Sequence, residues 1–334
     1  RVKYLIIFFV LLLGCSKRQS IGMKSHTFGK KGKHVVWIHV PGLATEHLAL
    51  LKLTRETTDQ KVSLENFECV GATWGYNLYT LRPDGFNGFL SQMLGSKNIQ
   101  GKCEDFDRKG VWSYFKDSGY EIGLMESDPH NQKSVTELST CSNPNNPFKD
   151  VFIWTQQKGK GSFSSFHYQE STGLNEHGTF YDKSCQKGKC YVSFRTNVEN
   201  MWPQFKDKRS KTFFSARYLE VQNAIERKDI SLLKEALYEL DKTISFFQEK
   251  KKNESLLIVV SSSVATPIIL PSEGKDWASY EKRGKNIVYQ RPSILGNSWA
   301  MGDGSENFCG TYEESEIYKR FLWMPEEDFF DAIL

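Results

Sequence analysis

The sequence has no C-x-x-C pair among its seven cysteines, and its histidines lie apart from them. Structural zinc sites are usually built on such pairs, so zinc is the less favoured explanation of the cysteines. The segment Lys158-Gly-Lys-Gly161 lacks the spacing of a phosphate-binding P-loop and is predicted to be a basic surface turn. No internal repeat is visible. These absences argue against a zinc module, a P-loop nucleotide-binding protein and a repeat protein.

The apolar run near the start is also too short for a membrane span, which needs about 20 residues. It covers Tyr4–Leu13, follows two basic residues and ends at Gly14-Cys15. This pattern is similar to the signal of a bacterial lipoprotein, in which cleavage leaves a lipidated cysteine at the N-terminus. We therefore expect a lipid anchor at Cys15, and Ser16 in the next position favours the outer membrane of the bacterial envelope. A plain secretory signal is the alternative.

Charge of neither sign dominates the chain. It contains 44 Lys and Arg against 40 Asp and Glu, a formal net charge of +4, which is too balanced to indicate nucleic-acid binding. We expect a signal peptide over residues 1–14, a flexible polar tether over 15–33 and a single α/β domain over 34–334. The membrane, through the lipid at Cys15, is the first predicted partner.

Six cysteines remain after Cys15, and an even number in an exported chain favours three disulfides with 15 possible connectivities. Cys185 and Cys190 flank a four-residue turn and should pair with each other. We expect Cys69 to pair with Cys103, which leaves Cys141 with Cys309.

The rest of the chain is organised around residues 33–53. Val35–Val40 is a short apolar, mostly β-branched run typical of a buried strand, Pro41-Gly42 ends it, and a helical pattern follows. This unit opens a parallel α/β sheet, where ligands bind just beyond the carboxyl ends of strands. A second buried strand is predicted at 256–260, beside 35–40 near the centre of the sheet. The helix over 230–250, capped by Asp229, should cover them through Leu233, Leu237, Leu240 and Ile244.

Further elements follow from shorter patterns. We expect helices over 86–94 and 216–227, strands over 120–125, 150–155 and 190–194, and an irregular connection at Trp202-Pro203.

In this order of elements the sequence resembles the alkaline phosphatase/sulfatase superfamily, in its sulfatase-like branch. Residues 35–43 look like the first strand of that family, and YTLRPDGFNGFLSQMLG (79–95) looks like its nucleophile segment. Residues 119–125 are similar to the next strand, and residues 238–265 to the helix and strand that precede a Ser-Asp-His-Gly turn. The resemblance implies a mostly parallel central sheet flanked by helices.

The sequence departs from that family where metal ligands are expected. The Asp-Gly after the first strand is replaced by Pro41-Gly42, and the later Asp-His falls on Ser263-Val264. The nucleophile position falls on Leu81, or on Thr80 if the register shifts by one residue. A metal hydrolase needs several carboxylates and imidazoles that converge on one cleft. We therefore expect no catalytic residue, no metal ligand and no cofactor at this site.

The cleft candidates are Pro41, Thr80, Arg82, Ser263, Asp303 and Glu306. Arg82 could bind a sulfate or phosphate through two parallel hydrogen bonds. Thr45 and Glu46 suit the first turn of a helix better than a nucleophile and a ligand. Under the alternative that the chain is an active hydrolase or transferase, a divalent metal would bind at a relocated site built from Asp128, His130, Asp303 and Glu306.

Three functions follow from these observations. The first is a membrane-anchored lipoprotein with the sulfatase-like fold that lacks hydrolytic chemistry and binds an anionic glycan or a protein partner. The second is the active hydrolase of sulfate or phosphate esters with the relocated metal site. The third is a structural envelope protein for which the fold is only a scaffold.

Overall fold

The computed structural model describes residues 32–54, 61–81, 84–128, 130–156, 163–170, 173–186, 189–282 and 288–322. The signal peptide, Cys15, the tether up to residue 31, Arg82 and the basic turn at 158–161 lie outside these ranges.

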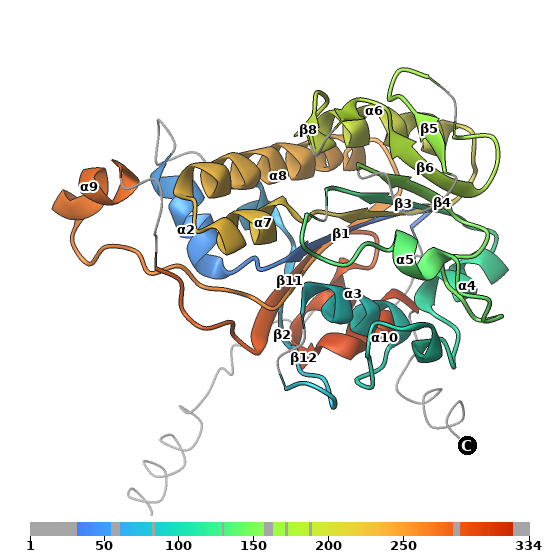
Figure 1. Cartoon of the computed structure of the whole chain (residues 1–334), viewed down its shortest axis with the longest axis horizontal. Helices are drawn as coiled ribbons and strands as arrows, with labels where there is room; N and C mark the ends of the chain where they lie inside the picture. The colour runs from blue at the N-terminus through green and yellow to red at the C-terminus, as the bar shows by residue number, and fades with distance from the viewer. Residues whose placement is uncertain are drawn as a thin grey trace, which may run out of the picture.

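A ten-stranded sheet forms the centre of the described structure, in the order β12-β2-β11-β10-β1-β9-β3-β4-β6-β5 (Figure 1). Within it β11 runs antiparallel to its neighbours, and the other pairings are parallel. The strands are β1 (His34–Pro41), β2 (Cys69–Trp74), β3 (Glu121–Glu126), β4 (Phe152–Thr155), β5 (Ser164–Phe166), β6 (Gly178–Asp182), β9 (Thr212–Arg217), β10 (Leu256–Ser263), β11 (Leu295–Gly302) and β12 (Gly310–Glu313). The predicted mostly parallel sheet is confirmed.

Helices cover both faces of this sheet (Figure 1). On one face lie α2 (Thr45–Leu53), α6 (Phe194–Asp207), α7 (Glu220–Arg227) and α8 (Ile230–Lys251), and on the other lie α3 (Gly85–Leu94), α4 (Val111–Asp117), α5 (Thr136–Ser139) and α10 (Ile317–Leu322). A further short helix is α9 (Trp277–Lys282), and a separate hairpin pairs β7 (Cys185–Gln186) with β8 (Lys189–Cys190).

The two central strands lie side by side as predicted. Their parallel register places Val36 opposite Ile258 and Pro41 opposite Ser263. Alternate residues of β1 face opposite sides, as the two-residue period of a strand requires. Val36 therefore packs in the core under α8, whereas Trp37 packs against Phe89 of α3.

The prediction for α8 is confirmed in its cap and its buried stripe. The side chain of Asp229 accepts hydrogen bonds from the backbone N–H groups of Ser231 and Leu232, which would otherwise lack partners at the helix start. Leu233, Leu237, Leu240 and Ile244 are all buried in the core beneath this helix.

Three predictions between residues 190 and 227 need correction. Where a strand was expected over 190–194, the structure has the end of the hairpin strand β8 and then the start of α6. Where an irregular connection was expected at Trp202-Pro203, α6 continues. Ser193 caps α6, and Phe194, Val198, Met201 and Trp202 follow at helical spacing and are buried. The helix expected over 216–227 begins at Glu220, because residues 212–217 form β9 between β1 and β3.

The disulfide prediction is confirmed for Cys185–Cys190 and wrong for the other four cysteines. The structure pairs Cys69 with Cys309 and Cys103 with Cys141. The reason is the strand order: β12, which follows Cys309 directly, pairs with β2, which begins at Cys69. This neighbourhood joins residues separated by 240 positions, which sequence spacing alone does not indicate.

Candidate functional site

The carboxyl ends of β1 and β10 meet at Pro41 and Ser263, where open α/β folds bind their ligands. Both residues are buried, and the N–H of Gly42 donates a 2.8 Å hydrogen bond to the carbonyl of Ser263. Val264 follows with a φ of +53°. A β-branched residue adopts this left-handed conformation at a cost in energy, so the turn after β10 is strained.

Helix α3 packs directly onto these two strand ends. A Cβ atom added to Gly85 would lie 2.6 Å from Cβ of Pro41, and one added to Gly88 would lie 2.5 Å from Cβ of Ser263. Real Cβ atoms essentially never approach other atoms so closely, so glycine is required at both positions for this contact. The first turn of α3 therefore covers the place where a ligand or metal would reach the strand ends.

A row of buried polar side chains crosses the sheet on the α3 side, one residue per strand. The strand register places these residues next to one another from β3 to β11, and each exposes at most 1% of its surface: Glu126, Arg217, His39, Ser261 and Ser298. Polar groups in such a dry environment need partners to offset their loss of hydration. The partners show which members of the row are fully engaged.

Glu126 and Arg217 form a fully buried ion pair. The carboxylate of Glu126 also accepts hydrogen bonds from the Ser134 hydroxyl at 2.5 Å and the Val135 N–H at 3.2 Å. Nη1 of Arg217 donates to the carbonyl of Lys133 at 2.8 Å, but its Nε and Nη2 have no partner among the described residues. Glu126 is therefore fully occupied within the protein, whereas part of the Arg217 guanidinium is not.

His39 contacts Ser263 through a 3.0 Å hydrogen bond between Nε2 and Oγ. Burial, helped by the positive charge of Arg217, holds the pKa of His39 well below its usual value, so the ring is neutral. A histidine beside a serine is the arrangement of an activated nucleophile, in which a third group normally orients the base. Nδ1 of His39 has no such partner in the described part of the chain, and both side chains are buried.

A second polar cluster lies under the far end of α3. Gln92 donates to a carboxyl oxygen of Glu314 at 2.6 Å and to the Ser262 carbonyl at 3.2 Å, and it accepts a bond from the Ser261 hydroxyl. Burial raises the pKa of Glu314 to about 8. Glu314 is therefore protonated at neutral pH, and a neutral carboxyl is a poor ligand for a cation.

These residues do not fit the divalent metal that the resemblance implies. No group of three or more His, Cys, Asp or Glu side chains is arranged to hold a metal ion in the ranges that the structure describes. Near the strand ends Glu126 is paired and Glu314 is protonated. Proline and valine stand where the resembling family has ligands, and neither side chain offers a donor atom.

The structure does not bring the relocated metal site together. Asp303 lies at the amino end of β10, where its N–H donates to the Leu256 carbonyl and its carboxylate accepts from Ser255. Asp128 and His130 instead follow the carboxyl end of the parallel strand β3. Eight strand residues separate the two ends, roughly 25 Å at about 3.3 Å per residue. The prediction of one site from these residues and Glu306 is therefore wrong.

The remaining cleft candidates are not grouped at the site. Thr80 is exposed in the segment after β2, and Arg82 lies outside the described residues. Thr45 is the first residue of α2 and donates to Glu46, as their helix-start interpretation predicted. Of the five candidates that the structure describes, Pro41 and Ser263 lie together at the strand ends, and they do so as packing residues.

Sequence reasoning missed His39, Glu126 and Arg217. The first lies in the run interpreted as continuously apolar, although the alternation of β1 places it on the α3 face beside Trp37. Glu126 directly follows the apolar stretch of β3, and Arg217, which ends β9, was predicted to lie in the helix over 216–227. A charged residue at the end of a buried strand was the available signal.

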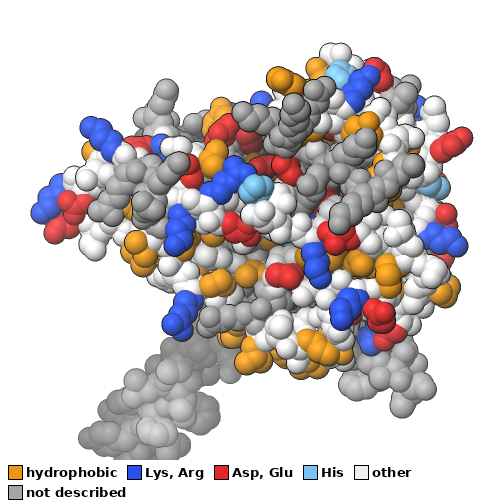
Figure 2. All heavy atoms as spheres, viewed as in Figure 1, with side chains coloured by type: hydrophobic (Ala, Val, Ile, Leu, Met, Phe, Trp, Pro, Cys, Tyr) orange, Lys and Arg blue, Asp and Glu red, His pale blue; other side chains and the backbone are white. Residues whose placement is uncertain are grey.

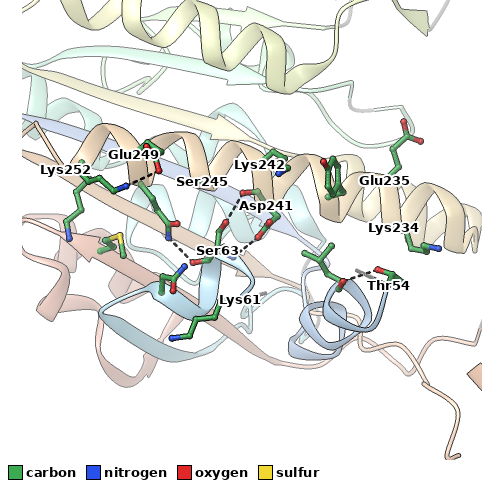
Figure 3. A pocket seen from close by; sticks show the side chains of 16 residues that line it. Thr54, Lys61, Ser63, Lys234, Glu235, Asp241, Lys242, Ser245, Glu249 and Lys252 are labelled. Carbon is green, nitrogen blue, oxygen red and sulfur yellow. Dashed lines mark hydrogen bonds and ion pairs between the residues drawn. The ribbon is translucent and has the colours of Figure 1, made fainter. Parts of the chain in front are cut away.

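Two hollows lie away from the strand ends of β1 and β10. A groove of about 980 Å³ lies between α8 and a wall made of Leu51, Thr54 and residues 61–66, and side chains from the two sides face each other across it (Figure 3). Five lysines line it: Lys61, Lys234, Lys242, Lys251 and Lys252. A smaller cavity of about 340 Å³ lies beside α6, α7 and α8, next to residues that follow β3 and β9.

No protein-family model matches the sequence, and no curated protein is similar to it. None of the described helices is long and apolar enough to cross a membrane.

Solved structures match the fold over most of both chains. The alkaline phosphatase of the Antarctic bacterium TAB5 is similar over 89% of this chain and all of its own, with a TM-score of 0.65 and 14% identity. A cold-active alkaline phosphatase of the psychrophile Shewanella sp. is similar over 88% of this chain and 100% of its own, with a TM-score of 0.65 and 9% identity. The alkaline phosphatase of Thermus thermophilus is similar over 96% of this chain and 99% of its own, with a TM-score of 0.64 and 10% identity. The chain therefore has the fold of the alkaline phosphatase/sulfatase superfamily.

Proposed function

We propose that this chain is a binding or envelope protein that uses the alkaline phosphatase fold without its hydrolytic chemistry. One observation carries the proposal: the first turn of α3 packs onto Pro41 and Ser263, at the edge where ligands bind in such folds. An ester substrate would have to displace this helix before it could reach the strand ends.

The chemistry of the covered residues supports the same conclusion. Hydrolysis by a metal enzyme requires a cation to polarise the ester and to activate the nucleophile. The carboxylate of Glu126 is already bound by Arg217, and the neutral His39 has only Ser263 as a hydrogen-bond partner among the described residues. Arg217 and His39 could act on a substrate only after the core had opened.

An anionic glycan is the ligand class that we propose first, and the groove in Figure 3 offers a surface for it. Lys251, Lys252 and Lys234 are each tied to a carboxylate, of Glu68, Glu249 and Glu281 respectively. Lys242 lies 5.3 Å from the centre of the Tyr238 ring and has no carboxylate partner in the described ranges. A partly exposed ammonium beside an exposed ring suits a sulfated sugar, which presents both an anion and an apolar face.

A protein partner is the second ligand class, and exposed apolar side chains support it. Figure 2 shows hydrophobic side chains at the lower edge of the molecule, where Figure 1 places β12 and the segment after β2. Trp74 lies directly opposite Leu295 in the sheet. The exposed fractions of these two residues are 42% and 40%. Leu78, Tyr79 and Leu81 follow with still larger exposure. Large apolar patches on soluble domains commonly mark binding surfaces.

Attachment to the bacterial envelope through lipid at Cys15 completes the proposal. The test is palmitate labelling of cells that express the chain, with Cys15→Ser as the control. We expect labelling of the natural chain alone. Labelling that persists in Cys15→Ser would contradict a lipid anchor at this residue.

The catalytic part is tested with the purified folded domain and aryl phosphate and aryl sulfate esters. Zinc, magnesium and calcium are each supplied in excess, and bound metal is measured after dialysis. We expect no turnover above background and no stoichiometric metal. Turnover that is lost in Glu126→Gln or His39→Asn, with the variant still folded, would show that the covered residues are catalytic.

Ligand binding is tested separately with a sulfated glycan. We expect Lys242→Ala to weaken binding, whereas Lys275→Ala, which removes an exposed lysine outside the groove, should leave it unchanged. If both variants weakened binding equally, the net charge of the protein, rather than the groove, would determine its affinity for the glycan.

A further inference from the structure

The cavity of about 340 Å³ lies beyond the carboxyl ends of β3 and β9, on the α8 side of the sheet. It does not include Pro41, His39 or Ser263, so it is distinct from the covered strand ends. Tyr218 and Phe194 form an aromatic wall, with ring centres 5.4 Å apart, and Leu232 and Ala236 of α8 add apolar surface. A few polar groups on an apolar lining are typical of small-molecule sites.

Acceptor atoms from two elements, the segment after β3 and helix α7, converge on this cavity. Asp128 follows β3, Glu220 begins α7, and Asn223 lies one turn further along α7. Asn223 exposes only 5% of its surface. Its Nδ2 donates to the Asp128 carbonyl at 2.9 Å, which fixes the amide orientation, and its Oδ1 has no partner among the described residues. A buried acceptor without a partner is costly, and a ligand that donates a hydrogen bond would remove that cost.

Carboxylates outnumber cations around the cavity, and Figure 2 shows acidic side chains over α7 and α8 on the face in view. Arg195 is held by Glu239 at 2.9 Å and by Glu199 at 3.5 Å, so its charge is largely compensated. The charged groups that face Glu220 from the surrounding elements are Asp128, Arg195, Arg227, Glu235 and Glu239.

We infer that this cavity binds a small organic cation, whose ammonium group donates hydrogen bonds to Asp128, Glu220 and Oδ1 of Asn223. The aromatic wall suits the same ligand, since a cation is attracted to the face of a ring. A bare calcium ion fits less well because it takes six to eight oxygen ligands. The described residues contain no cluster of three carboxylate, imidazole or thiolate groups placed to hold a metal. This site is independent of the proposed function.

The titration of Glu220 gives the site a measurable signature. Burial, together with the negative charge of Asp128, raises the pKa of Glu220 to about 7, while a hydrogen bond from the Asn223 side chain and the positive charge of Arg227 oppose this shift. The ionised carboxylate binds a cation better than the protonated form does. Between pH 6 and pH 8 the ionised fraction rises from about one tenth to about nine tenths, so affinity should rise by about tenfold.

The probe is 1,4-diaminobutane, titrated calorimetrically into the folded chain at pH 6 and pH 8, with 1,4-butanediol as its uncharged analogue. We expect saturable binding of the diamine, stronger at pH 8, and no binding of the diol. Glu220→Gln and Asp128→Asn, both nearly isosteric, should each weaken binding at least tenfold, and Glu220→Gln should also remove the pH dependence. Glu199→Gln is the matched control, because Glu199 does not line the cavity, and should change affinity less than twofold.

Three outcomes would overturn the inference. They are the absence of saturable diamine binding at both pH values, equal weakening by Glu199→Gln and Glu220→Gln, and stoichiometric calcium binding that the diamine does not displace. Thermal unfolding of each variant shows that it is folded before its affinity is compared. None of these outcomes depends on whether the chain hydrolyses esters, so this inference and the proposed function can fail separately.

Discussion

His39 and Ser263 lie 3.0 Å apart, Nε2 to Oγ, on two paired central strands, and neither side chain exposes more than 1% of its surface. The pair has the hydrogen bond of an activated serine but lacks access to solvent. Helix α3 covers it through two glycines that allow close contact. The same packing therefore stabilises the domain and covers the pair.

The contact between α3 and β10 predicts the effect of Gly88→Ala. The added Cβ would lie 2.5 Å from Cβ of Ser263 and 2.9 Å from a carboxyl oxygen of Glu314, so the helix must shift. We expect a loss of about 1–3 kcal/mol in the free energy of unfolding, measured by chemical denaturation. Ser263→Gly should restore part of this loss in the double variant. Gly274→Ala, where the added Cβ meets nothing within 4 Å, is the control.

The buried ion pair predicts strong coupling between Glu126 and Arg217. Arg217→Met leaves the carboxylate buried without its counter-ion and should cost about 3–5 kcal/mol of stability. The double variant Glu126→Met, Arg217→Met should recover much of the loss, because no unpaired charge then remains. A double-mutant cycle measures the coupling, and additive losses would show that the two groups act independently.

The raised pKa of Glu314 predicts a loss of stability at alkaline pH. Its pKa is about 8 in the folded chain against 4.5 for the ordinary group, so the folded state holds a proton that the unfolded state releases. Stability therefore falls as pH rises from 4.5 through 8. Glu314→Gln keeps the acceptor for Gln92 and should be more stable than the natural chain at pH 9, by on the order of 4 kcal/mol, with little difference at pH 4.5.

The control for this prediction is Glu313→Gln. Glu313 is bound to Lys97, and that hydrogen bond lowers its pKa, the opposite direction. A gain in stability at pH 9 in this variant as well would mean that a general charge effect, rather than Glu314, causes the change.

The lowered pKa of His47 predicts a loss of stability at acid pH. Burial lowers its pKa to about 3, and Nδ1 accepts a hydrogen bond from the Ala44 N–H. The unfolded chain takes up a proton near pH 6.5, so stability falls as pH drops from 6.5 toward 3. His47→Gln should make this fall shallower by about 1.4 kcal/mol per pH unit. Exposed His130→Gln, measured by the same pH series of denaturation curves, should leave the slope unchanged.

The disulfides predict two different stability losses. Cys69–Cys309 closes a loop of 240 residues, and Cys185–Cys190 closes one of five. By the chain-entropy model the long bridge contributes about 5 kcal/mol and the short one about 2 kcal/mol. Paired replacement by alanine, followed by denaturation, should give losses in this order. A larger loss for the short bridge would point to a native-state role for the hairpin.

The sequence by itself determined the central strands, the long helix and the residues at their ends. Continuous apolar runs specify strands buried on both faces, and a repeat of about 3.6 residues specifies α8 because both are local patterns. The presence of Pro41 and Val264, whose side chains have no metal-binding atom, after the two strands is likewise a matter of identity alone.

Tertiary structure decided which distant residues meet. Residues 212–217 form a strand because β1 and β3 lie on either side of them, and this placement brings Arg217 to Glu126, 91 positions away in the sequence. Strand order also paired Cys69 with Cys309 and placed Asp303 at the opposite end of the sheet from Asp128. Such contacts depend on register and topology, because a hydrophobic pattern shows which face is buried but not which neighbour covers it.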